Sequence, residues 1–280
     1  ALTNVGLFGN GRAFEYLLIR LRASPLKEMQ IIASSLHVEL KKVMPPFVKR
    51  VYTEHGDTWV NYFKETDKAM EEKVKSIVGG EVKQADSVEL IDYDAHAVEK
   101  IIEAILYQYS EYPLSQIKKI VAELSREQKN EIIQEYLRRR ENRRHKPWRS
   151  FELAYYTFDI LGNYGIYRDL QRHRILTQMR QLLSTRNGYD TPHELVEAGF
   201  ADKYHDVMQL AAEAYEEIAS QFPKEAQYIV PFGYRIRWLF TLNARQIFNM
   251  VELRTVKQGH PDYRKICQQS HLSLYYYRSI

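Results

Sequence analysis

Cysteine is almost absent from this sequence, with Cys267 the only one among 280 residues. A single cysteine cannot form a disulfide within the chain, and this usage fits a reducing compartment, so we expect a cytoplasmic protein. The nine histidines are scattered along the chain. Because neither cysteines nor histidines occur at a spacing typical of zinc ligands, we expect no metal site.

Long apolar runs are absent as well. No stretch of about 18 apolar residues occurs, so we expect neither a transmembrane helix nor a membrane partner. The first residues, ALTNVGLFGNGRAFEY, lack the basic start and the apolar core of a signal peptide. The chain begins at Ala1 without an initiator methionine, which leaves open what precedes it.

Several common active-site motifs are missing. The sequence contains neither a P-loop nor a G-x-G-x-x-G fingerprint. It also offers no Ser-His-Asp or Cys-His arrangement around an activated nucleophile. Enzyme classes that depend on these motifs therefore receive no support from this chain.

A strong excess of one charge is also lacking, because the net charge is only +4. This charge does not by itself require a nucleic-acid partner. The basic residues are nevertheless uneven. Residues 137–150, LRRRENRRHKPWRS, hold six Arg, one Lys and one His against a single Glu. Such a run is typical of a solvated helix end, and equally of a surface that binds a phosphate-rich ligand or nucleic acid.

Local patterns predict a mixed α+β protein that is rich in helix. Ser125 and Gln128 form a capping box at the start of a helix. Ser87–Tyr93 alternates apolar and acidic residues as a short strand does. The β-branched and aromatic run 228–243 predicts another strand, followed directly by a helix over Ala244–Arg254.

Two further helices are expected in the second half of the chain. A long helical pattern covers Phe151–Leu183 and is broken near Gly162 and Gly165. Thr191-Pro192-His193-Glu194 has the form of a capping box with proline at the first helical position, and Gly199 ends that helix soon afterwards.

Two segments carry more arginine and asparagine than a plain core needs: 169–186, DLQRHRILTQMRQLLSTR, and 243–254, NARQIFNMVELR. If the first is helical, Arg172, His173 and Arg174 cannot share one face, because each step rotates by about 100°. They can still surround a bulky ligand that lies across a helix end or between subunits. The alternative for the second segment is a buried helix with structural Asn caps and salt bridges.

Together, the two segments resemble the flavin-dependent thymidylate synthases. That family has an RHR triplet, then a VLP…TxNARxxxNFxxLR stretch, which here is VPFGYRIRWLFTLNARQIFNMVELR at 230–254. Residues 151–174 also match the family's FEHxxFTF…RHR region without a gap. The resemblance is close over about 150–260 and looser over 86–280, and it implies the helix-rich fold with a small sheet of the thymidylate synthase complementing proteins.

The resemblance also implies roles for individual residues. The triplet would hold the pyrimidine edge and phosphate of FAD, where guanidinium groups stabilise the anionic reduced flavin. Arg254 would bind the substrate and would also be the catalytic residue, because its charge polarises a carbonyl of the uracil ring. The expected cofactor-binding residues are Arg172, His173, Arg174, Asn243, Arg245 and Asn249.

The activity implied is methylation of dUMP to dTMP with methylenetetrahydrofolate and NADPH, through FAD. Family sites form between chains, so the resemblance implies a homo-oligomer, a tetramer or, for a tandem chain, a dimer. The main alternative is a degenerate homologue that binds flavin or another nucleotide without making thymidylate. A third alternative, of another class, is a helical protein that binds nucleic acid through residues 138–149.

The sequence departs from the family where the dUMP phosphate would bind. The family's Ser-x-Arg falls on Leu182 and Ser184, and a Ser-x-Arg occurs only two residues later, ending at Arg186. The second phosphate-binding arginine is replaced by Gln227. We therefore expect substrate binding by Ser184, Arg186, Gln227 and Arg254, with residues 138–149 as a possible replacement source of positive charge.

An internal repeat suggests how the chain is divided. Residues 10–33 resemble residues 243–267 when a one-residue gap is allowed in the alignment. Each segment has Asn-x-Arg, an apolar helix, Leu-Arg, a polar turn and another helix. Gly79-Gly80 is the best linker candidate. We therefore predict that residues 1–80 are the tail of a preceding, related module and that 86–280 form the flavin-dependent module, with chance similarity of amphipathic helices as the alternative.

Overall fold

The computed structural model describes residues 5–80 and 87–276 of the chain. The chain forms two compact units, Ala1–Lys83 and Gln84–Ile280, so the break falls just after Gly79-Gly80. Gly80 has a φ of +96°, a backbone conformation that glycine adopts without steric cost. No helix in the described ranges combines the length and apolarity needed to cross a bilayer.

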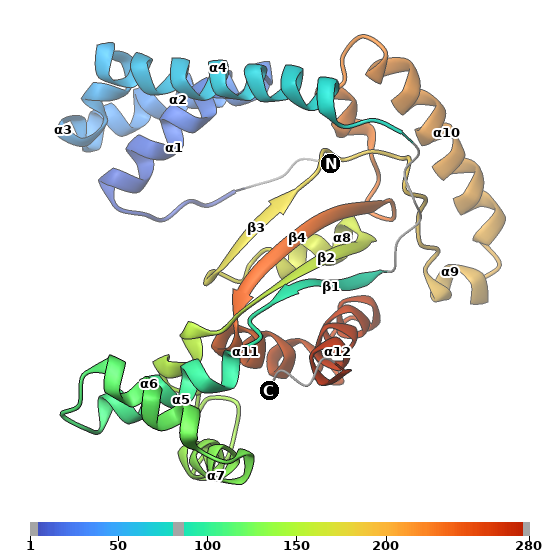
Figure 1. Cartoon of the computed structure of the whole chain (residues 1–280). Coiled ribbons are helices and arrows are strands. Elements are labelled where there is room, and N and C mark those ends of the chain that lie inside the picture. The colour runs from blue at the N-terminus through green and yellow to red at the C-terminus, as the bar shows by residue number, and fades with distance from the viewer. Residues whose placement is uncertain (1–4, 81–86, 277–280) are drawn as a thin grey trace. The chain divides into compact units, whose positions relative to one another are not determined.

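The first unit is helical (Figure 1). Its α-helices are α1 (Gly11–Ala23), α2 (Lys27–Val43), α3 (Pro45–Val48) and α4 (Glu54–Ile77). Asn10 caps α1, because its side-chain oxygen accepts a hydrogen bond of 2.9 Å from the backbone N–H of Ala13. A small core holds the unit together: Leu18, Ile19, Ala23, Ala33, Val48, Val51 and Val60.

The second unit is built on a four-stranded antiparallel sheet with the strand order β1-β2-β4-β3 (Figure 1). The strands are β1 (Val88–Tyr93), β2 (Tyr155–Asn163), β3 (Leu176–Arg180) and β4 (Arg235–Asn243). The two central strands pair over nine residues, from Tyr155 opposite Asn243 to Asn163 opposite Arg235. Their buried side chains alternate with half-buried ones, so one face of the sheet forms most of the core.

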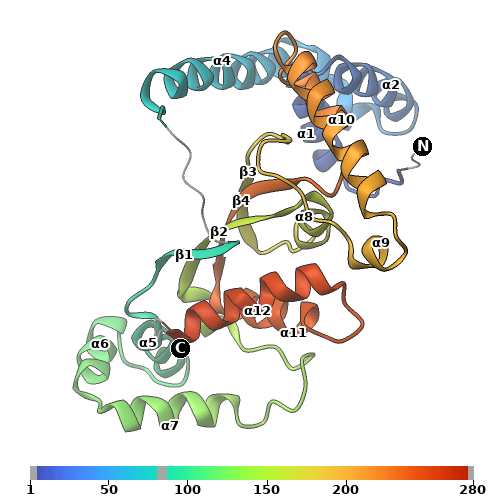
Figure 2. The ribbon, with the colours of Figure 1, turned by 90° about the vertical axis from the view of Figure 1, so that its right-hand side faces the viewer.

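Three helices share the core beneath this face: α8 (Tyr164–Leu170), α11 (Ala244–Arg254) and α12 (Pro261–Tyr276). Figure 2 shows α11 and α12 side by side below the sheet. Phe158 and Phe240 on the strands, with Leu170 and Met250 on the helices, belong to one buried cluster. Burial of such large side chains stabilises by about 1.5–3 kcal/mol each before the entropy of ordering them is subtracted.

The other described helices of the second unit include two that bury side chains in the same core, one with Ile101 and Ile105 and one with Met208 and Tyr215. These other helices are α5 (Ala97–Gln108), α6 (Leu114–Glu123), α7 (Arg126–Leu137), α9 (His193–Glu197) and α10 (Ala201–Ala219). Short 3₁₀ turns occupy Lys49–Tyr52, Arg149–Leu153 and Glu225–Ile229. The capping box of Ser125 and Gln128 is confirmed at the start of α7, with both reciprocal hydrogen bonds formed.

The predicted long helical pattern over Phe151–Leu183 was wrong. The segment instead contains β2, α8 and β3, because Tyr156, Phe158 and Ile160 recur at every second residue and are buried in the core on one face of the sheet. The predicted Thr191 cap was also wrong. Helix α9 begins with Pro192 as its N-cap and has no side-chain hydrogen bond there.

Candidate functional site

Two copies of one local motif organise the centre of the second unit. Each central strand ends at an asparagine that caps the next helix: Asn163 before α8 and Asn243 before α11. Each side-chain oxygen accepts a hydrogen bond of 2.9 Å from a backbone N–H three residues on. The strands are antiparallel and their register centres on Asp159 opposite Leu239, so a local two-fold axis relates the copies.

Because of this symmetry, the two helices start at opposite ends of the sheet and their last turns meet. Arg254, the last residue of α11, donates a hydrogen bond of 2.9 Å to the backbone carbonyl of Asp169, in the last turn of α8. The meeting point lies where α8 ends and the Arg172-His173-Arg174 triplet begins. The fold thus brings the two sequence motifs together within one chain.

The triplet lies on a turn between α8 and β3 and is not helical, contrary to the helical pattern assumed for 169–186. The side chain of His173 is buried, whereas Arg172 and Arg174 are exposed. Arg172 forms an ion pair with Asp169 on the preceding turn. The turn therefore directs the histidine inward and presents both arginines to solvent.

His173 connects the triplet to α11. Its Nδ1 lies 2.9 Å from the side-chain amide of Gln246, and its Nε2 accepts a hydrogen bond of 3.2 Å from Nε of Arg254. Burial, followed by the positive charges of Arg254 and Arg172, lowers the pKa of His173 to about 4. The imidazole is therefore neutral at neutral pH.

The hydrogen bonds also decide which nitrogen of His173 carries the proton. Arginine has no acceptor atom, so Nε2 must accept from Arg254 and the proton of the neutral ring sits on Nδ1. The amide atom of Gln246 at 2.9 Å from Nδ1 is its nitrogen, which is only a donor, so a protonated Nδ1 requires the amide in its flipped orientation, with the oxygen toward the ring. Gln246 and Arg254 together fix both the tautomer and the orientation of the ring.

Within the part of the chain that the structure describes, Arg254 is held by neutral groups. Besides the histidine and a backbone carbonyl, its guanidinium lies 5.3 Å from the ring centre of Tyr263. Since all three partners are uncharged, the positive charge of Arg254 is not compensated by them. Arg254 lines an open cavity of about 580 Å³ together with Arg143, Leu253, Val256, Gln258, Gly259 and Tyr263.

The other expected cofactor residues have partners of their own. Asn243 is buried and caps α11, as the structural alternative for this segment predicts. Arg245 donates from Nε to the carbonyl of Pro147 at 2.6 Å and from Nη1 to Glu152 at 2.8 Å, which leaves Nη2 for any further contact. Asn249 is half-buried. Contact of these residues with a flavin stays a prediction.

The expected phosphate-binding residues lie elsewhere and are engaged within the protein. Arg186 makes two hydrogen bonds of 2.9 Å to Glu216 on α10, and these lower the pKa of that carboxyl group. The side-chain oxygen of Gln227 accepts the backbone N–H of Leu183 at 3.1 Å. An arginine could not accept this bond, which gives a structural reason for glutamine here. Ser184 is half-buried beside them.

Sequence reasoning missed Gln246 and Tyr263, two of the groups that hold His173 and Arg254. Gln246 lies one turn beyond the Asn243 cap, in the middle of a recognised motif, so its position offered a signal. Its partner His173 is 73 residues away in the chain and is reached only through the pairing of β2 with β4. No local pattern contains that information.

The sequence is similar to one protein family and to several curated relatives. The sequence model of the thymidylate synthase complementing protein family matches residues 89–273. The UPF0159 protein of Chlamydia pneumoniae is 39% identical over 270 residues, and that of Chlamydia muridarum is 40% identical over 272. Each alignment covers 95% of this chain but only 50% and 51% of the relatives, so the chain spans about half the length of the curated relatives it matches.

The fold has a counterpart among solved structures. The crystal structure of the UMP/dUMP methylase PolB from Streptomyces cacaoi, bound with 5-Br dUMP, superposes with a TM-score of 0.52 at 16% identity, covering 69% of this chain and 91% of that one. The predicted helix-rich α+β fold with a small sheet is therefore confirmed. On the match of the family model, the chain belongs to the family of thymidylate synthase complementing proteins.

Proposed function

We propose that this protein is a flavin-dependent thymidylate synthase, which methylates dUMP to dTMP with methylenetetrahydrofolate and NADPH through FAD. The observation that carries the proposal is the junction of His173, Gln246 and Arg254, which joins the two family motifs at one place. Family membership supports the same reaction class. The similar fold of PolB, whose described ligand is a dUMP analogue, supports a pyrimidine nucleotide as substrate.

The residues present fit a flavin. Arg172 and Arg174 expose two guanidinium groups on either side of a buried, neutral histidine. Planar donors of this kind suit the N1 and O2 edge of the ring and a neighbouring phosphate. When bound, the flavin would supply the hydride. The protein's own contribution would be to hold the ring's anionic edge against these arginines.

Arg254 would act on the nucleotide. Its uncompensated positive charge can polarise a carbonyl of the uracil ring as negative charge develops on that oxygen. The contacts to His173, the Asp169 carbonyl and Tyr263 hold the guanidinium in one orientation, so little reorganisation is needed during the reaction. A protonated His173 could not accept this bond, which is why its low pKa matters for the site.

We further propose that the site is completed between chains or modules in a homo-oligomer. FAD is too large to be covered by the turn at Arg172–Arg174 alone, and Asn249, the other expected contact, lies on a different element, α11. We also infer that residues 1–80 are the tail of a preceding module. The double length of the relatives supports this, as does the Asn10 cap of α1, which parallels the Asn243 cap of α11.

The test is product formation. Purified protein should be supplied with dUMP, NADPH, FAD and methylenetetrahydrofolate labelled in its methylene group, and the nucleotides analysed by mass spectrometry. Labelled dTMP that disappears in Arg254→Ala supports the proposal. Oxidation of NADPH without labelled dTMP would instead favour the degenerate homologue, which the internal pairing of Arg186 and the hydrogen bond of Gln227 make the second candidate.

A further inference from the structure

The cavity beside Arg254 contains a second arginine from a distant part of the chain. Arg143 and Arg254 both line it, together with the amide of Gln258 and the hydroxyl-bearing ring of Tyr263. None of the residues lining this cavity is a carboxylate. Its polar groups include four side chains that can donate hydrogen bonds, two of them positively charged, so the cavity has the chemistry of an anion site.

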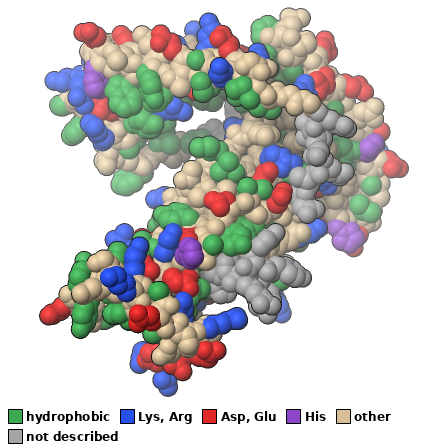
Figure 3. All heavy atoms as spheres, viewed as in Figure 1, with side chains coloured by type: hydrophobic (Ala, Val, Ile, Leu, Met, Phe, Trp, Pro, Cys, Tyr) green, Lys and Arg blue, Asp and Glu red, His purple; other side chains and the backbone are tan. Residues whose placement is uncertain are grey.

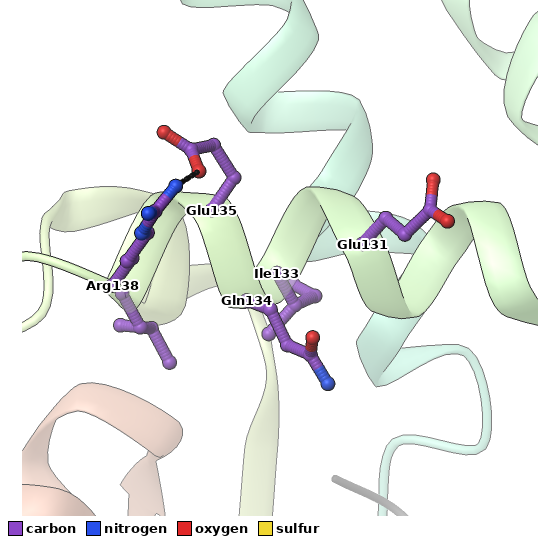
Figure 4. A pocket seen from close by; sticks show the side chains of 6 residues that line it. Glu131, Ile133, Gln134, Glu135 and Arg138 are labelled. Atoms are coloured by element: carbon purple, nitrogen blue, oxygen red, sulfur yellow. Dashed lines mark hydrogen bonds and ion pairs between the residues drawn. The ribbon is translucent and has the colours of Figure 1, made fainter.

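The position of Arg143 separates it from the rest of the basic segment. Arg138 and Arg139 pair with Glu135 on α7, as the close view in Figure 4 shows for Arg138. Arg140 pairs with Glu252 on α11, and Arg149 with Glu152. Figure 3 shows basic and acidic side chains interleaved over the surface of α5 to α7. Four of the segment's seven Arg and Lys side chains are therefore already paired with nearby carboxylates.

Three basic residues of the segment remain: Arg143, Arg144 and Lys146. Within the described residues, none of them forms an ion pair with a carboxylate. Of the three, Arg143 alone lines the cavity that contains Arg254. It offers the cavity an uncompensated guanidinium group.

The turn that carries Arg143 is ordered by its own hydrogen bonds. The side-chain oxygen of Asn142 accepts the backbone N–H of Arg144 at 2.9 Å, and the carbonyl of Asn142 accepts that of His145 at 3.0 Å. Arg140 reaches both the carbonyl of His145 and Glu252 of α11. These contacts fasten the turn to the helix that ends in Arg254, which keeps Arg143 beside the cavity.

We propose that this cavity binds the phosphate of the nucleotide substrate and that Arg143 is its phosphate-binding arginine. The inference rests on the proposed function, since it assigns a phosphate subsite to that reaction. It accounts for the state of Arg186 and Gln227: one is paired with Glu216 and the other is neutral and occupied by a backbone N–H. The apolar side chains of Leu253 and Val256 give the cavity a surface for the sugar or base.

The same cavity chemistry would suit a phosphate group of FAD, so the experiment must separate the two sources. Binding of dUMP, deoxyuridine and FAD should be measured by isothermal titration calorimetry on the full chain. The variants are Arg143→Ala and, as a matched control at the next residue of the same turn, Arg144→Ala. Loss of one charge-assisted hydrogen-bonding partner should weaken dUMP binding roughly 10- to 100-fold.

The expected result is a loss of dUMP affinity in Arg143→Ala, with deoxyuridine and FAD binding unchanged and Arg144→Ala equal to wild type. A loss of FAD affinity instead would assign the cavity to the cofactor and overturn the inference. Equal effects of Arg143→Ala and Arg144→Ala on dUMP would overturn it too, since they would indicate a general effect of charge.

A second measurement keeps the inference separate from the proposed function. Inorganic phosphate should be titrated while the Nε–H signals of the arginine side chains are followed by NMR. Shifts of the Arg143 and Arg254 signals, without any binding of dUMP, would leave an anion site in place and count against thymidylate synthesis. Binding of dUMP with no shift of these signals by phosphate and no effect of Arg143→Ala would overturn the inference while the proposed function stood.

Discussion

The buried histidine makes the stability of the second unit depend on pH in a defined window. The pKa of His173 falls from its usual 6.5 to about 4 in the folded protein. Between these two pH values the unfolded chain binds a proton that the folded protein does not, so stability falls as the pH is lowered. The contribution is fully present above pH 6.5 and is lost as the pH falls through 4.

The size of the effect follows from the pKa. At ~1.4 kcal/mol for each pKa unit, the difference corresponds to about 3 kcal/mol of unfolding free energy. The structural reason is twofold. A protonated ring would add positive charge beside Arg254 and Arg172, and its Nε2 would become a donor facing the donor of Arg254.

The assay compares wild type with His173→Gln, whose side-chain oxygen can still accept from Arg254 but cannot titrate. Urea unfolding is followed by tryptophan fluorescence at several pH values between 4 and 7. As the pH falls over this range, wild type should lose ~3 kcal/mol more unfolding free energy than His173→Gln does. NMR titration should assign the lowered pKa to the ring signal that His173→Gln removes and that His193→Gln leaves in place. Parallel pH dependence in wild type and His173→Gln would refute the reasoning.

Three other predictions concern the same site. Arg254→Lys should keep the flavin but slow the chemical step in single-turnover assays, because a point charge replaces a planar fork; equal loss of flavin and folding would indicate a structural role instead. Mixing Arg172→Ala with Asn249→Ala protein should restore part of the activity if sites are shared, and no recovery after verified subunit exchange would argue for a site within one module. Gln246→Leu should lower the unfolding free energy by about 1–3 kcal/mol in urea titrations, because Nδ1–H of His173 loses its buried acceptor, and unchanged stability would contradict this.

Local sequence patterns predicted the elements whose signals are short-range. The helix Ala244–Arg254 is observed with those bounds, and the predicted strand Ser87–Tyr93 is observed over Val88–Tyr93. Residues 151–183 were misjudged because aromatic and apolar residues there fit both a helical and an alternating pattern. Pairing with β1 and β4 on both sides decides in favour of the strand.

The site could be predicted only in part for a similar reason. The two motifs marked Arg254 and the His173 turn by resemblance, but the contact between them depends on the symmetric pairing of β2 with β4. Likewise, the basic segment 138–149 was recognisable as charge, whereas the carboxylates that balance it belong partly to other elements, such as Glu252 on α11. Which arginine stays uncompensated is a property of the fold.

The most direct test of the central claim, a flavin held where the two motifs meet, is the visible spectrum of the purified protein as dUMP is added. The account predicts a flavin absorption band, retained on purification or gained after incubation with FAD, that dUMP perturbs in wild type. Removing the triplet's charge with Arg172→Ala and Arg174→Ala together should abolish the band while the protein stays folded. A protein that shows no flavin band even after incubation with FAD would contradict the account.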